Sequence, residues 1–105
     1  MFQLTDKAAA QVREAAKVGG TQGVALRLAA RQKPDGSIDY MMGFDDKKDD
    51  DIEINASGVE VVIAPEYMNL LSEATMDYVE IEEGDFRFIF MNPADANYTP
   101  PPVQD

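Results

Sequence analysis

The chain contains no cysteine and no histidine among its 105 residues. Without cysteine there is no disulfide, no thiolate nucleophile and no usual ligand for zinc or an iron–sulfur cluster. Without histidine, the commonest general base near neutral pH and the main nitrogen ligand for transition metals are also missing. What remains is the chemistry of carboxylates, of lysine and of hard cations bound through oxygen. We therefore predict that the protein is not an enzyme and acts by binding another protein.

Long hydrophobic runs are also missing. Residues 59–65 form one of the longest apolar stretches and are interrupted by Glu60, whereas a membrane-spanning helix needs about 20 apolar residues. Charged residues throughout positions 1–20 break up the apolar run that a secretory signal requires. We expect no membrane partner and a cytoplasmic location. With 45% hydrophobic residues, a chain of this length can bury the core of one domain.

Basic residues are scarce: nine lysines and arginines face 20 acidic residues, which gives a net charge of −11. Such a surface repels a phosphate backbone, so we expect no nucleic-acid partner. The acidic charge has two interpretations that remain open. It keeps the protein soluble, or it attracts a partner with a basic surface. In either case we expect a monomer or a weak dimer.

Local patterns predict a mainly β, α+β domain. Thr5 is a suitable N-cap for a helix that ends at Gly19-Gly20. Alternating or β-branched apolar residues predict strands at 23–31, 37–44, 52–54, 59–63, 76–81 and 86–90. The segment 33–36, Lys-Pro-Asp-Gly, predicts a tight turn, and Pro65 favours the start of a second, short helix. The result is about six short strands, mostly antiparallel, and two helices in two packed layers.

The C-terminal residues differ in character from the rest of the chain. Proline occurs at positions 93, 100, 101 and 102, among small polar residues. Such a segment cannot pack or join a sheet, so we predict a folded domain at 1–91 and a disordered, proline-rich tail at 92–105.

The order and spacing of several short motifs resemble the HesB/IscA family, the A-type iron–sulfur carriers. The matching segments are Leu4–Ala9, Leu26–Leu28, Tyr40–Phe44, Gly58–Ile63, Met76–Val79, Phe86–Phe88 and Asn92–Pro93. The resemblance covers nearly the whole chain. It implies the family fold, a two-layered, barrel-like sandwich.

The resemblance also implies where cluster ligands would lie. Family members carry one cysteine in the loop after the first strand and a Cys-Gly-Cys pair in the tail. In this chain those places are taken by Asp35, Thr99 and Pro101. A proline or a threonine hydroxyl cannot replace a thiolate, so no metal, cluster or other cofactor is expected.

Cysteine-less members of the family accompany the sulfur-oxidation genes of certain bacteria, and this chain resembles them. The resemblance implies a regulatory or accessory role in bacterial sulfur oxidation, carried out by protein binding. Two alternatives remain open. The protein could bind iron or calcium through oxygen ligands, or it could be an accessory factor in iron–sulfur assembly.

Two acidic segments are the candidate protein contacts. The first comprises Asp45, Asp46, Asp49, Asp50 and Asp51, and the second comprises Glu80, Glu82, Glu83 and Asp85. The first is expected to be an exposed loop, because such a charge run cannot bury itself. Its spacing differs from an EF-hand, although a calcium site remains an alternative. The second is either a solvated turn or a binding surface. Asp35 is interpreted as a turn residue, with a role as an oxygen ligand for iron as the alternative.

Overall fold

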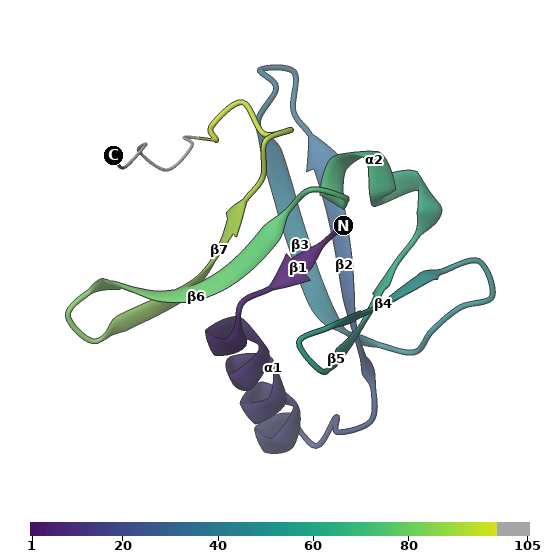
Figure 1. Ribbon diagram of the computed structural model, residues 1–105, viewed down its shortest axis with the longest axis vertical. Helices are drawn as coiled ribbons and strands as arrows, with labels where there is room; N and C mark the ends of the chain where they lie inside the picture. The colour runs from purple at the N-terminus through teal and green to yellow at the C-terminus, as the bar shows by residue number, and fades with distance from the viewer. Residues whose placement is uncertain (99–105) are drawn as a thin grey trace.

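The structure, a computed structural model, describes residues 1–98 and contains two β-sheets with two α-helices beside them (Figure 1). The elements in chain order are β1 (Gln3–Leu4), α1 (Asp6–Gly19), β2 (Ala25–Gln32), β3 (Ile38–Asp45), β4 (Ile52–Ala56), β5 (Val59–Ile63), a 3-10 turn (Pro65–Tyr67), α2 (Met68–Leu71), β6 (Thr75–Glu82) and β7 (Asp85–Met91). Within this described part of the chain, no helix is long and apolar enough to cross a membrane.

The two sheets have different strand orders. The larger runs β3-β2-β5-β4 and the smaller runs β1-β6-β7. Hairpin neighbours pair antiparallel, but β2 pairs parallel with β5, and β1 pairs parallel with β6. The predicted mainly β, α+β class is confirmed. The sequence pattern did not predict β1, which is a strand of only two residues. It did not predict the parallel pairings either, because these join segments that are far apart in the chain.

Helix α1 is fixed to the smaller sheet at its first turn. The backbone N–H of Ala8 donates to Oγ1 of Thr5 over 3.1 Å, which confirms the predicted N-cap. The hydroxyl of Thr5 in turn donates to Oδ1 of Asp77 in β6 over 2.6 Å. The apolar side of α1, including Val12 and Ala16, is buried. One side chain therefore both starts the helix and sets its position beside β6.

The core lies between the sheets. Its largest fully buried apolar side chains come from four separate elements and the N-terminus; they are Phe2, Leu28, Ile63, Leu71 and Met76. Burying a side chain of this size stabilises the fold by about 1.5–3 kcal/mol. Residues 1–98 contain no cysteine, and no group of three or more histidine, aspartate or glutamate side chains among them is placed to hold a metal ion. We therefore take apolar packing as the main source of stability for this part of the chain.

The β6–β7 hairpin extends beyond this core, as Figure 1 shows. A row of aromatic rings marks the transition. Near the core, Phe90 stacks on Tyr40 of β3 with ring centroids 4.1 Å apart. Further out, Tyr78 contacts Phe88 at 4.8 Å and Phe86 at 5.8 Å. Phe86 is 45% exposed, and Ile81, near the end of the hairpin, is 52% exposed. The outer half of the hairpin therefore presents apolar groups to solvent.

Candidate functional site

Asp35 lies at the tip of the β2–β3 hairpin and holds the turn together. Its Oδ1 accepts hydrogen bonds from the backbone N–H of Ser37 over 3.0 Å and from the Ser37 hydroxyl over 2.6 Å. The side-chain and backbone hydrogen bonds from Ser37 lower the pKa of Asp35. The backbone N–H of Gly36 donates to the carbonyl of Lys33, so the predicted turn is present. These contacts support the interpretation of Asp35 as a turn residue.

Residues 92–98 pack against this hairpin tip. The side chain of Asn92 is 1% exposed, and its Nδ2 donates to the carbonyl of Leu70 over 2.6 Å. The backbone N–H of Ala96 donates to the carbonyl of Gly36 over 3.0 Å. The two segments lie together at the top of Figure 1. The predicted start of a disordered tail at residue 92 is therefore wrong, because Asn92 supplies buried hydrogen bonds that composition does not reveal. Thr99 and Pro101 lie outside the described residues.

Tyr40 gives this segment a second attachment. Its hydroxyl donates to Oδ2 of Asp95 over 3.0 Å, while its ring stacks on Phe90. Burial is the main cause that raises the pKa of Tyr40 to about 12. The phenol therefore stays protonated at neutral pH and acts as a hydrogen-bond donor. The sequence pattern predicts Tyr40 as a strand residue but gives no sign of this contact, which joins residues 55 positions apart.

The donor groups at the hairpin tip do not fit an iron–sulfur cluster. They are one carboxylate already engaged by Ser37, hydroxyl groups and backbone atoms, whereas clusters are held by thiolates. Across residues 1–98, no group of three or more histidine, cysteine, aspartate or glutamate side chains is arranged to hold a metal ion. The fold thus places the tip of the β2–β3 hairpin beside residues 92–98. The described residues at this place supply no thiolate that could bind cluster iron.

The first acidic segment is organised by a residue that sequence analysis overlooked, Arg27 of β2. Its Nε donates to Oδ2 of Asp45 over 2.7 Å, and its Nη1 donates to Oδ1 of Asp51 over 2.9 Å. Nη2 completes a bidentate pair with Asp51 and also donates to the carbonyl of Asp46. Bidentate arginine–carboxylate pairs are the stronger class of ion pair. Arg27 therefore fastens both ends of the 45–51 segment to the sheet.

The prediction that the whole 45–51 run is exposed is wrong for Asp51. The side chain of Asp51 is only 1% exposed, because Arg27 and the backbone N–H of Lys48 surround its carboxylate. These same contacts hold the pKa of Asp51 well below its ordinary value. One carboxylate of a charged segment can be buried when a cation from a distant strand pairs with it, as Arg27 does with Asp51. Asp51 is therefore a structural residue and not a free surface contact.

The remaining acids of this segment are only partly available. Asp46, Asp49 and Asp50 are exposed. Asp45 is half-buried and also pairs with Lys48 at 3.0 Å, and Lys47 pairs with Glu53 at 3.4 Å. Cations from within the segment and from Arg27 thus offset much of its charge. The local field is weaker than the count of aspartates suggests.

The second acidic segment keeps most of its charge. Residues 77–87 contain five carboxylates and one cation, Arg87. Arg87 pairs with Asp85 at 3.1 Å, and Asp77 is engaged by Thr5. Glu80, Glu82 and Glu83 are exposed, although Oε2 of Glu80 also accepts the backbone N–H of Gly84. The hairpin therefore combines negative charge with exposed aromatic surface, a combination that sequence alternation alone did not single out.

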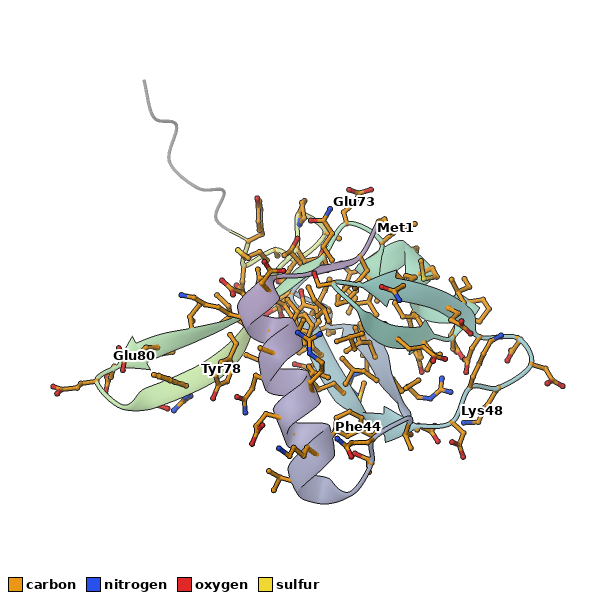
Figure 2. All side chains as sticks on the ribbon, turned by 60° about the horizontal axis from the view of Figure 1, so that its bottom comes forward. Met1, Phe44, Lys48, Glu73, Tyr78 and Glu80 are labelled. Carbon is orange, nitrogen blue, oxygen red and sulfur yellow. The ribbon has the colours of Figure 1, made fainter. Side chains whose placement is uncertain are left out.

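The two acidic segments lie at opposite ends of the molecule. In Figure 2, Tyr78 and Glu80 mark the β6–β7 hairpin on one side, and Lys48 marks the 45–51 segment on the other, with α1 between them. The structure does not bring the candidate contacts into one surface. They are two separate candidates for partner binding.

The two-sheet, mainly β domain agrees with the fold that the resemblance to the A-type iron–sulfur carriers implied. Residues 1–99 match the family described as iron-sulphur cluster biosynthesis, and the chain belongs to this family.

Individual relatives agree with this assignment. The iron-sulfur cluster insertion protein ErpA of Erwinia tasmaniensis is 34% identical over 93 residues, which is 88% of this chain and 81% of that protein. The crystal structure of IscA with a [2Fe-2S] cluster superimposes with a TM-score of 0.70 at 27% identity, over 89% of this chain and 86% of the other. Escherichia coli SufA, at 24% identity and a TM-score of 0.71, shares the fold over 94% of this chain and 86% of its own.

Proposed function

We propose that the protein is a non-enzymatic accessory or regulatory factor that keeps the carrier fold as a protein-binding scaffold and carries no iron–sulfur cluster. One observation supports this most strongly: the three positions at which the family resemblance implies cysteines hold Asp35, Thr99 and Pro101. The only sulfur atoms in the chain are the thioethers of six methionines. A thioether is neutral and cannot replace the charged, soft thiolate that cluster iron requires.

The biological setting follows from the subgroup resemblance. Loss of all cysteines within an intact family fold is the feature shared with DsrR, the cysteine-less protein that accompanies bacterial sulfur-oxidation genes. On this ground the proposed role is regulation of sulfur oxidation in the cytoplasm through a protein partner. The exposed carboxylates of both acidic segments favour a partner with a basic surface.

Cluster reconstitution tests the loss of carrier activity. Purified protein is mixed anaerobically with ferrous iron, sulfide and reductant, desalted, and examined by ultraviolet–visible spectroscopy with analysis of bound sulfide. The wild type is expected to stay colourless. The matched control is the triple variant Asp35→Cys, Thr99→Cys, Pro101→Cys, which restores the three donors and should gain charge-transfer absorption. A wild-type protein that retains sulfide in proportion to polypeptide would refute the proposal.

A second candidate is an accessory role in iron–sulfur assembly, which the names of the insertion-protein relatives favour. Gene deletion separates the two roles in a sulfur-oxidising organism that encodes the chain. The regulatory role predicts altered consumption of reduced sulfur with unchanged aconitase activity. The assembly role predicts the opposite pattern. Complementation with the wild-type gene controls for effects on neighbouring genes.

A further inference from the structure

We propose that the groove between α1 and the β6–β7 hairpin is a docking surface for a basic segment of another protein, one that inserts a large apolar side chain against Phe86. This inference rests on the proposed protein-binding function and specifies where and what the protein binds. The groove has a volume of about 640 Å³ and is lined by Ala10, Gln11, Glu14, Tyr78, Glu80 and Phe86, among others. Figure 2 shows α1 and the β6–β7 hairpin, the two elements that supply these residues.

Two aromatic side chains, Tyr78 and Phe86, line the groove. Phe86 is 45% exposed, and its ring meets Tyr78 edge to face at 5.8 Å. Tyr78 in turn contacts Phe88, which packs on the core. The exposed ring is therefore held in place by contacts with neighbouring aromatic side chains. Rigid, partly exposed aromatic side chains are typical anchors of protein interfaces.

The negative charge around these aromatic side chains favours a partner with a basic surface. Glu14 borders the groove on α1, and Glu80 borders it on the hairpin. Exposed Glu82 and Glu83 continue the negative surface beyond it. Among the residues described, 1–98, Lys7 is the one cation that lines the groove. Lysine or arginine side chains flanking an apolar anchor complement this arrangement, since opposite charges steer encounter and fix orientation.

The same charge disfavours other occupants. A second copy of the chain would place acidic hairpin against acidic hairpin, on top of a net charge of −11 per chain. An anionic membrane or a nucleic acid is repelled for the same reason. The 45–51 segment is the weaker candidate, because Arg27 pairs with Asp45 and Asp51, and Lys48 pairs with Asp45.

The test uses a synthetic probe of defined chemistry. A fluorescein-labelled 16-residue amphipathic peptide of lysine and leucine is titrated with the protein, and binding is followed by anisotropy and by ¹⁵N chemical shifts. Two control peptides replace every lysine with glutamate or every leucine with serine. Saturable binding is expected for the lysine–leucine peptide alone. The shift changes should fall on residues 7–14 and 78–88.

Matched variants assign the binding to the groove. Phe86→Ser should weaken binding by about tenfold, the size of loss typical of an interface anchor. Val18→Ser changes a residue that is 79% exposed at the far end of α1, and it should leave binding unchanged. The pair Glu80→Gln and Glu83→Gln should weaken binding and reduce its salt dependence, whereas Asp49→Asn with Asp50→Asn should do neither. The charge variants remain decisive if Phe86→Ser lowers stability.

Several results would overturn the inference. They are shift changes on residues 45–51, equal binding of the glutamate peptide, absence of binding, a Phe86→Ser variant with wild-type affinity, or dimerisation of the protein through the hairpin. None of these depends on a cluster. A protein that fails here but stays colourless on reconstitution leaves the proposed function standing, whereas a protein that binds a cluster refutes that function whatever the peptide result.

Discussion

Replacement of Asn92 by alanine tests the attachment of residues 92–98 to the domain. Asn92 is 1% exposed. Its Nδ2 donates to the carbonyl of Leu70 over 2.6 Å, and its Oδ1 accepts the backbone N–H of Ala94 over 3.1 Å. Alanine has no side-chain amide and therefore makes neither hydrogen bond. The substitution therefore loses two hydrogen bonds in one step and breaks a link between the end of α2 and the segment after β7.

The expected loss of stability follows from these contacts. A typical internal hydrogen bond contributes about 1 kcal/mol, and a buried group left without a partner costs about a further 1 kcal/mol or more. Ala94 is exposed, so its amide can bond to water; Leu70 is half-buried, so its carbonyl is the group that loses most. The free energy of unfolding should fall by about 2–3 kcal/mol. For a domain of this size, that lowers Tm by about 10 °C or more.

Thermal and urea denaturation, followed by circular dichroism, measure this change. Asn97→Ala is the matched control, because Asn97 is exposed in the same segment and should change stability by less than about 0.5 kcal/mol. The wild-type spectrum at 20 °C should be retained by both variants. If Asn92→Ala is as stable as Asn97→Ala, the reasoning is refuted, because the hydrogen bonds of Asn92 then contribute nothing to stability.

Two further predictions concern the other structural contacts. Because Arg27 holds the pKa of Asp51 below its ordinary value of 3.8, the pair stabilises the fold above about pH 4 and loses this effect as pH falls further. Asp51→Asn should therefore lower Tm at pH 7 by more than it does at pH 2–3. Asp49→Asn is the control, because Asp49 does not pair with Arg27. Gly36 has a φ of +88°, and an added Cβ would lie 3.1 Å from Cβ of Ala96. In urea denaturation, Gly36→Ala should therefore cost more than the about 1–2 kcal/mol that the left-handed backbone alone costs an alanine. Gly23→Ala, at φ +86° with no atom within 4 Å, measures the backbone cost alone, and equal losses would argue against the contact with Ala96.

Much of the local structure was predictable because its causes are local. The N-cap at Thr5 and the turn at 33–36 depend on residues within a few positions of one another, and both are present. The strands at 38–45 and 85–91 follow from alternation of apolar and polar residues. The parallel pairing of β2 with β5 was missed, since pairing between distant strands leaves no periodic pattern in either one.

The candidate contacts also differ in whether local sequence or tertiary contacts determine their exposure. Exposure of Glu80, Glu82 and Glu83 follows from their charge. Burial of Asp51 does not, because it requires Arg27, which lies 24 positions earlier. Likewise, Asn92 sits among residues whose composition predicts a free tail, and only its contact with Leu70, 22 positions away, makes it part of the domain.

The sequence by itself determined which chemistry is missing, because a side chain that is not encoded cannot be supplied by folding. The absence of cysteine and histidine and the excess of carboxylates belong to that category. Only the tertiary structure decided which carboxylates remain free. Arg27 offsets one acidic segment, whereas the hairpin keeps its charge beside the exposed ring of Phe86. The physical reason is that burial and charge pairing depend on distances in space, and the chain order does not specify them.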